Sequence, residues 1–510
     1  MLCSNCMCSI SATGNPPVLE AADLLSLKSL TELNAELVLV DKMARYLEER
    51  RMLLKHRMNA DSPIGRLPAE LFIQICQECD VTPLQLGSVC QDWRRIIWST
   101  PLLWSSLSIH VRWRTGTTKC NLLKQWLRRA ETTPLRIKVT ADNDCDEALY
   151  GIFKMLVSRA AFWGSIDCVV PAPAYELLEN CTFPLLTSVK LRPASSTLTT
   201  FFTEPPKMFD AVPRLVDLDL LGYNTAPEGV MWARLRSLKS QALRVPDLLD
   251  ILRCSPSLVE CQARKIYGTT DEFGDIDYGG TSLGDTLQHT NLTCLDVSLL
   301  SVAALPLLDS IALPSLLRLK VKYNGPGSIL HRITGLLERS RCRLRALDIE
   351  EPNLMLANLI ICLKATPSLE DLHIMSSEAS VSPASIGGTW GKELVHLMNP
   401  RYSDPLLPLL VSFDYYGPLL CDVVDLLDML QHRRVPKADC LGWTPDNPHT
   451  WIRSVNVTSV KTYNMTKDDS DHIRNLTRSE VCLTIRPVLF IASQPPDRQR
   501  MRVINNALEH

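Results

Sequence analysis

The spacing of apolar residues changes several times along the chain, and each change marks a different predicted element. After a loose tail over residues 1–22, apolar residues recur every three or four positions from 23 to 61 without glycine or proline, which predicts one long helix. Its stripe has the heptad pattern of a coiled coil and consists of Leu30, Leu33, Leu37, Val40, Ala44, Leu47, Arg51 and Leu54. The helix could self-associate with another chain, pack against its own domain, or remain a free amphipathic helix.

A second pattern predicts a small helical domain over residues 62–109. Pro63 ends the long helix, and Leu67-Pro68 begins a helix with proline in its first turn. Its apolar face consists of Leu71, Phe72, Ile75, Cys76 and Cys79. The capping-box pattern from Thr82 to Gln85 opens a second helix that runs to Thr100-Pro101. Its stripe consists of Leu86, Val89, Cys90, Trp93 and Ile97. A domain of ~45 residues cannot bury both stripes alone, so they must pack on the rest of the chain, on a partner, or on both.

A third pattern, Leu-x-x-Leu-x-Leu and close variants, recurs through residues 110–435. The first leucine of each copy stands at Leu186, Leu215, Leu235, Leu258, Leu292, Leu316, Leu344, Leu369 and Leu410. Most steps between these positions lie in or near the ~20–29 residues of a leucine-rich repeat. Leu135-Arg-Ile137-Lys-Val139 can be read as an earlier strand of the same array.

The alternation inside each copy predicts where its side chains point. Residues two apart on a strand face the same side, so the paired leucines of stacked strands form one core and the residue between them faces the opposite side. Helical patterns lie between the strands, as at Leu330, Ile333 and Leu337. We therefore expect an α/β fold in which a curved parallel sheet carries helices on its convex side. A doubly wound α/β domain is the alternative, and the lack of a glycine-rich phosphate turn disfavours it.

Composition narrows the function. Apolar residues make up 46% of the 510 positions and the formal net charge is −2, so no whole-chain charge favours nucleic acid or an anionic membrane. We find no apolar stretch of the ~18–20 residues that a membrane helix needs. The 18 cysteines are scattered and no secretory leader pattern is present, which predicts reduced thiols and a cytoplasmic or nuclear location.

A search for reactive groups predicts neither an enzyme nor a cofactor. Phosphate-loop, dinucleotide, zinc-protease and nucleophile-elbow motifs are absent from the sequence. Cys3, Cys6 and Cys8 lack a second ligand pair nearby, so we expect no metal. Cys76 and Cys79 are assigned to the buried stripe of their helix. Residues 110–139 hold eight Lys or Arg and one acid, Glu131; a solvated helix face and a patch for an acidic partner or nucleic acid are both open.

These residues together carry a family resemblance. The series Leu67-Pro68-x-Glu70-Leu71, Ile75, Val89-Cys90-x-x-Trp93-Arg94 and Pro101-x-Leu103-Trp104 resembles an F-box in the form common in large fungal families, and the repeats resemble those of leucine-rich-repeat F-box proteins. The resemblance implies an F-box over residues 62–109, an irregular solenoid over 110–435, and a C-terminal cap or terminal repeats over 436–510. Asn324 fits the asparagine position of such repeats, whereas Tyr223 replaces it in another copy, and residues 375–405 resemble an insertion.

The resemblance also implies a function. Such a protein is the substrate-recognition subunit of an SCF-type cullin–RING ubiquitin ligase. The contact with its Skp-type adaptor would be made or supported by Leu67, Pro68, Leu71, Ile75, Val89, Cys90 and Trp93, with Trp104 packing the box on the first repeat. A protein substrate would meet the concave face at Lys190, Asp217, Asp219, Asp296, Lys320, Asp348, His373 and Asp414. The alternative is a repeat scaffold that has no link to ubiquitination.

Overall fold

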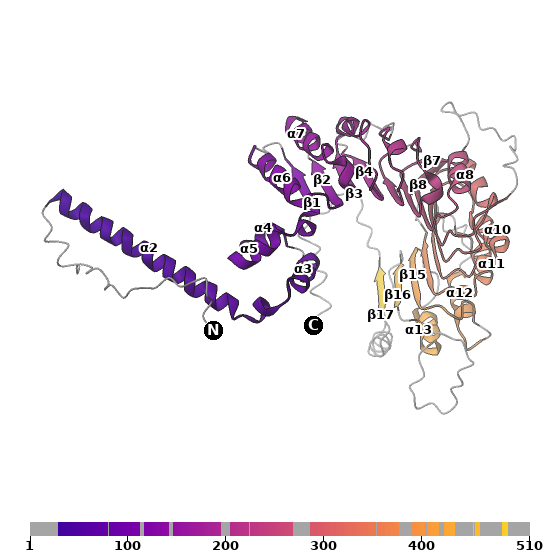
Figure 1. Ribbon diagram of the computed structural model, residues 1–510. Coiled ribbons are helices and arrows are strands. Elements are labelled where there is room, and N and C mark those ends of the chain that lie inside the picture. Colours follow the sequence, from indigo (N-terminus) through magenta and orange to yellow (C-terminus); the bar gives the residue numbers. More distant parts are fainter. Residues whose placement is uncertain are drawn as a thin grey trace. The chain divides into compact units, whose positions relative to one another are not determined.

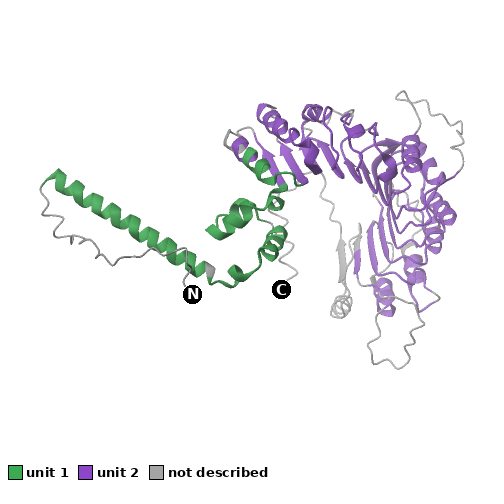
Figure 2. Ribbon diagram, viewed as in Figure 1, with its two compact units in different colours: residues 1–106, 124–133 green, residues 107–123, 134–510 purple. Residues whose placement is uncertain are grey.

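The chain is a mixed α/β protein with a large parallel sheet and a long N-terminal helix. The structure, a computed structural model, describes residues 29–79, 81–112, 117–141, 146–194, 205–223, 225–268, 286–352, 354–376, 390–402, 405–417, 423–433, 452, 454–459 and 482–487. Two compact units make up the chain (Figure 2). The N-terminal unit comprises residues 1–106 and 124–133, and the sheet unit comprises residues 107–123 and 134–510.

Helix α2, Leu30–Ala60, confirms the predicted long helix, although residues 23–28 lie outside the described part of the chain. Ser29 caps its first turn, since the Glu32 amide donates to the Ser29 hydroxyl and the Ser29 amide donates to the Glu32 carboxylate. The heptad leucines and Val40 are exposed, so within the described residues this stripe belongs to no core.

The described residues that follow α2 up to Trp104 form short helices. Their bounds are Pro63–Arg66 for η1, Ala69–Glu78 for α3, Pro83–Leu86 for α4, Gln91–Trp98 for α5 and Pro101–Trp104 for η2. Pro68 is the N-cap of α3. The capping box at Thr82 and Gln85 is confirmed, but the single helix expected after it is wrong. The chain turns at Gly87 and is extended at Cys90, where φ is −154° and ψ is 173°, so that α5 begins anew.

Aromatic contacts hold these helices together. Phe72 of α3 meets Trp93 of α5 edge-on, with ring centroids 4.7 Å apart. Trp104 is fully buried and donates its indole N–H to the Ile97 carbonyl at 2.8 Å. Trp126, on the part of α6 (Thr117–Ala130) that belongs to this unit, lies against Trp104 with centroids 4.9 Å apart and donates to the Trp104 carbonyl at 2.8 Å. The sequence predicted Trp104 as an anchor and did not single out Trp126.

The sheet unit is built on one sheet whose strands follow each other in sequence order, with β7 pairing beside β8 (Figure 1). The pairings from β2 to β17 are parallel. The strands are β1 Ser106–Val111, β2 Leu135–Ala141, β3 Trp163–Val170, β4 Ser188–Pro193, β5 Asp217–Leu220, β6 Ser237–Ser240, β7 Leu243–Arg244, β8 Glu260–Tyr267, β10 Cys294–Leu299, β12 Arg318–Tyr323, β13 Ala346–Glu350, β14 Asp371–Met375, β15 Ser412–Gly417, β16 Ser454–Ser459 and β17 Cys482–Pro487. Leu287–Gln288 (β9) and Ile311–Ala312 (β11) form a separate pair.

The recurring leucines form the core of this unit. All nine first leucines of the repeat copies are buried. Leu295, Leu319 and Leu347 face one another in register on neighbouring strands. Two residues on, Val297, Val321 and Ile349 form the next buried row. The period-two prediction is therefore confirmed, and residues between these rows lie on the opposite, open face.

Helices cover the core face along part of the sheet. In Figure 1, α8, α10 and α11 lie along the same side of the sheet. The helices of this unit are α7 Asp146–Val157, α8 Val245–Cys254, α9 Pro306–Asp309, α10 Leu330–Ser340, α11 Leu356–Lys364, α12 Trp390–Met398 and α13 Val423–His432. Between β3 and β6 the described parts of the connections hold the 3-10 turns η4 (Ala172–Leu178), η5 (Phe209–Ala211) and η6 (Trp232–Arg234) in place of longer helices.

The structure corrects the assignment of Asn324. β12 continues its alternation to Tyr323, which is buried and donates its hydroxyl to the Pro326 carbonyl at 2.7 Å, while Asn324 is exposed. Tyr223 is likewise buried and lies 6.4 Å from Tyr175, centroid to centroid. The Tyr175 hydroxyl lies 2.9 Å from the Cys168 carbonyl oxygen and 2.8 Å from that of Arg192, so its single proton is shared between these two acceptors. Tyr323 at the end of β12 and Tyr223 after β5 are therefore the buried side chains at these strand ends, and Asn324 is not.

One further expectation changes in the C-terminal part. The proposed insertion over residues 375–405 contains α12, which packs beside α11 and α13, so this part is not a simple insertion. Residues 377–389 lie outside the described residues. Beyond residue 435, β16 and β17 extend the sheet in parallel register, in which Val455 is paired with Phe413 and Leu483 with Val455 along the backbone.

Candidate functional site

The residues that the F-box resemblance assigns to adaptor binding divide into an exposed group and a supporting group. Leu67, Pro68, Leu71, Ile75 and Val89 are exposed. Cys90 and Trp93 are half-buried, and Trp93 packs edge-on against buried Phe72. Exposed leucine, isoleucine and valine side chains on a small, aromatic-anchored unit provide an apolar surface that water solvates poorly. We call Leu67, Leu71, Ile75 and Val89 the box surface.

The two cysteines of α3 and its end differ in their surroundings. Cys76 is buried, and this burial raises the pKa of its thiol. Cys79, which the sequence placed on the buried stripe, is exposed, so that assignment is wrong. The reason is that α3 ends at Glu78 and Cys79 has an extended conformation with ψ of 132°.

One arginine of the basic segment, residues 110–139, packs against aromatic rings, whereas other basic residues of the segment are exposed. Lys124, Arg128, Arg136 and Lys138 are exposed, in agreement with a solvated face. Arg129 instead lies half-buried over two indole rings, 5.1 Å from the Trp98 centroid and 5.0 Å from that of Trp104. This geometry is that of a cation–π contact and assigns Arg129 to the packing of the N-terminal unit.

The open face of the sheet carries a row of polar side chains in register, one from each long strand. We call it the central row, and it consists of Lys138, Asp167, Lys190, Asp219, Lys239, Gln262, Asp296, Lys320, Asp348, His373, Asp414 and Asn456. Basic and acidic residues alternate from Lys138 to Lys239 and again from Asp296 to Asp414, if His373 is counted as basic. Neighbouring strands lie ~4.8 Å apart, so adjacent members are close enough to pair.

The second half of the central row lines a hollow of about 250 Å³. Its charged or titratable lining residues are Cys294, Asp296, Arg318, Lys320, Asp348, Asp371, His373 and Asp414. Five of the eight concave-face residues expected from sequence therefore lie together. Arg318 and Asp371 stand two residues before row members on their strands and were missed; the same alternation rule would have found them.

Hydrogen bonds and ion pairs connect most of the row members in the hollow. Gln262 donates to Asp296 at 2.7 Å, Lys320 donates to Asp348 at 2.5 Å, and Asn456 donates to Asp414 at 2.7 Å. The His373 ring lies between two carboxylates, with Nε2 4.0 Å from Asp348 and Nδ1 3.8 Å from Asp414. A ligand in this hollow would therefore compete with internal pairs as well as with water.

Burial and pairing together alter the pKa of two groups in the hollow. Burial raises the pKa of Asp296 above its usual range, although the hydrogen bond from Gln262 and the charge of Lys320 oppose the rise. Burial alone would lower the pKa of Lys320, but the hydrogen bond and charge of Asp348 outweigh it and raise that pKa. Lys320 is thus held as a cation against a carboxylate.

The remaining predicted concave-face residues lie elsewhere on the same face. Lys190 is exposed and Asp217 is half-buried, and neither lines the hollow. Asp219 is buried and accepts a hydrogen bond from Arg192 at 2.8 Å, so its carboxylate is already engaged. The sequence reading missed Lys138, Asp167 and Lys239, whose strands are shorter copies of the pattern or precede the first complete one.

Comparison with protein-family models and with curated protein sequences finds no match for this chain. Among the described residues, no helix is both long and apolar enough to span a membrane. Within those residues there is also no group of three or more His, Cys, Asp or Glu side chains placed to hold a metal ion.

Proposed function

We propose that this chain is the substrate-recognition subunit of an SCF-type ubiquitin ligase. In this proposal, the box surface binds a Skp-type adaptor, and the sheet unit is an irregular leucine-rich-repeat solenoid whose open face binds a protein substrate. The observation that carries the proposal is the exposure of the apolar side chains of the box, at positions where the F-box pattern requires adaptor contacts.

The packing of the N-terminal unit supports this role. Phe72, Ile97 and Trp104 form its buried interior, while Leu71 and Ile75 on α3 remain 48% and 47% exposed. One face of α3 therefore stabilises the unit and the adjoining face is available. Burying an exposed leucine or isoleucine contributes ~1.5–3 kcal/mol, so a few such side chains suffice for specific binding.

The sheet supports the second half of the proposal. Its strands are parallel, follow the sequence order and repeat the same buried positions, as expected of stacked repeats. The hollow on the open face mixes carboxylates with Arg318 and Lys320, and its acidic side chains are the more numerous. This composition favours a substrate segment with an excess of basic residues.

The test is co-purification of the full chain with a purified Skp-type adaptor. The Leu71→Glu/Ile75→Glu double variant should lose adaptor binding at least ~100-fold, because two apolar contacts become buried charges. Leu122→Glu provides the matched control: Leu122 is 41% exposed on α6, outside the box surface. This control should bind like the unaltered chain.

Circular dichroism and thermal unfolding of both variants should match the unaltered chain, since all three positions are exposed. Failure of the unaltered chain to bind the adaptor at ~10 μM, well above the usual range of specific complexes, would overturn the proposal. Equal binding by the double variant would show that the box surface is not the contact.

A repeat scaffold without a ligase role is the second candidate. It is favoured by the contact of Trp104 with Trp126, through which the box region acts as structural support for the N-terminal unit. This candidate predicts no adaptor binding, together with lower thermal stability when Trp104 is replaced.

A further inference from the structure

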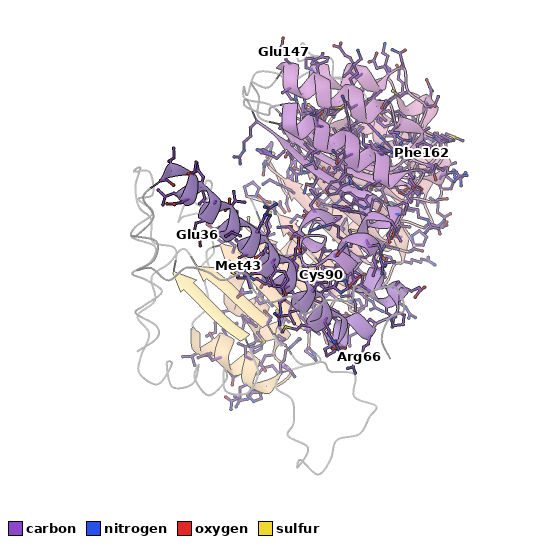
Figure 3. All side chains as sticks on the ribbon, turned by 60° about the vertical axis from the view of Figure 1, so that its left-hand side comes forward. Glu36, Met43, Arg66, Cys90, Glu147 and Phe162 are labelled. Carbon is purple, nitrogen blue, oxygen red and sulfur yellow. The ribbon has the colours of Figure 1, made fainter. Side chains whose placement is uncertain are left out.

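The long helix α2 has an apolar stripe that the described structure leaves uncovered. Its leucines at the predicted coiled-coil seam are exposed, with Leu37 at 59% and Leu47 at 57%. Figure 3 shows the side chains along α2 and labels Glu36 and Met43, which are seven residues apart and therefore lie along one edge of the helix. At 1.5 Å per residue, 31 residues give a helix ~46 Å long, enough for about four heptads.

The heptad register follows from the seam. Leu30, Leu37, Ala44 and Arg51 occupy the a positions, and Leu33, Val40, Leu47 and Leu54 occupy the d positions. The flanking g positions are Glu36, Met43, Arg50 and Arg57, and the flanking e positions are Asn34, Asp41, Glu48 and Lys55. Acidic flanking residues thus dominate the first half of the helix and basic residues dominate its end.

From this charge pattern we infer that two copies of the chain associate through α2 as an antiparallel coiled coil. With Val40 opposite Ala44 of the second copy, Leu37 meets Leu47 and Leu30 meets Leu54, so every seam position from 30 to 54 has an a-to-d partner. The remaining pairing sets Leu33 against Arg51 of the other copy, so the seam is apolar through its middle and at its ends, and one guanidinium enters it near each end. The association does not depend on the adaptor or on the substrate.

The flanking charges decide the orientation. In a parallel pair, each g residue faces the e residue five positions later in the other chain, so Glu36 would face Asp41 and Arg50 would face Lys55, both with like charge. In the antiparallel pair, Glu36 faces Arg50 of the other copy twice in the dimer, and Met43 faces Met43. Among the flanking residues, only Asp41 has a partner of like charge, because it faces Asp41 of the other copy at the two-fold axis. Glu36 is itself mostly buried in the structure, at 8% exposed, so its carboxylate must turn toward the seam on pairing.

Analytical ultracentrifugation of the full chain without adaptor tests the association. The unaltered chain should sediment at twice its mass of 57.2 kDa at tens of micromolar and dissociate on dilution. Leu37→Glu/Leu47→Glu should raise the dimer dissociation constant at least ~100-fold, because four seam leucines in the dimer are replaced by charges. The control Leu39→Glu/Leu53→Glu changes the same residue types at exposed positions off the seam and should leave the constant unchanged.

Charge reversal tests the orientation. Arg50→Glu should weaken the antiparallel dimer several-fold, and Glu36→Lys/Arg50→Glu should restore it. A parallel dimer would instead tighten on Arg50→Glu, because the introduced carboxylate would face Lys55. A monomeric unaltered chain at ~100 μM, or equal effects of the seam and control variants, would overturn the association itself. A tighter Arg50→Glu dimer would overturn the antiparallel arrangement.

Discussion

Glu351 provides a stability test that follows directly from its surroundings. It comes immediately after β13 and is fully buried. One carboxylate oxygen accepts a hydrogen bond from the Ile329 amide at 3.1 Å, while Oε2 has no hydrogen-bond partner among the described residues. Burial raises the pKa of Glu351 to about 7 from an ordinary 4.5, although hydrogen bonds from Ser328 and Ile329 oppose the rise.

The raised pKa determines the sign of the pH effect. Between about pH 4.5 and 7 the folded chain holds the Glu351 proton and the unfolded chain has lost it, so the free energy of unfolding falls as pH rises. At ~1.4 kcal/mol per pH unit, the full loss is ~3 kcal/mol and is reached above about pH 7. Glu351→Gln removes this titration and keeps the amide acceptor for Ile329.

Urea denaturation from pH 5 to pH 8 measures the effect, and hydrogen exchange of the α10 amides gives a local readout beside Ile329. The stability of Glu351→Gln relative to the unaltered chain should increase by ~3 kcal/mol across this range. Glu338→Gln makes the same substitution at an exposed position of α10 and serves as the matched control. Parallel pH profiles for Glu351→Gln and the unaltered chain would refute a raised pKa at Glu351.

Three other changes test separate parts of the packing by thermal or urea unfolding. Arg433→Lys should destabilise the chain by ~2–4 kcal/mol. The buried guanidinium donates to the carbonyls of Met398, Leu406 and Leu407, and an ammonium cannot reach all three. An unchanged free energy of unfolding would show that these carbonyls find other donors. Trp126→Phe should lower stability by ~1–3 kcal/mol by leaving the Trp104 carbonyl without its donor, and an unchanged melting temperature would contradict this. Gly151→Ala, in the open interior of α7, should stabilise by ~0.5–1 kcal/mol; any destabilisation would mean that the added methyl group meets a neighbour.

Much of the sheet could be predicted because its rule is local. Leu319 and Val321 are two residues apart, so both must face the core, and Lys320 between them must face the open side. Repetition of this short pattern then set neighbouring strands in register, which brought Asp296, Lys320 and Asp348 together. No long-range information was needed to place these three residues on one face.

The errors arose where packing overrides local pattern. The apolar spacing predicted one continuous helix through Gly87. The chain turns there, and a Cβ at this position would lie 3.2 Å from the Pro83 carbonyl oxygen. The extended backbone at Cys90 cannot be seen in the spacing of apolar residues. The contact of Trp126 with Trp104 joins residues 22 positions apart and depends on the tertiary arrangement. Tyr323, and not Asn324, is the buried side chain at the end of β12, because this strand continues to residue 323, farther than the repeat pattern predicts.

The alternating signs of the central row impose a parity rule on changes in repeat number. Loss of the single repeat that carries β12 would set Asp296 beside Asp348, and like charges directly opposite each other on neighbouring strands are destabilising. Loss of two successive repeats, with β12 and β13, would set Asp296 beside His373 and preserve the alternation. Duplications follow the same arithmetic, so this array should gain or lose repeats more readily in pairs than singly.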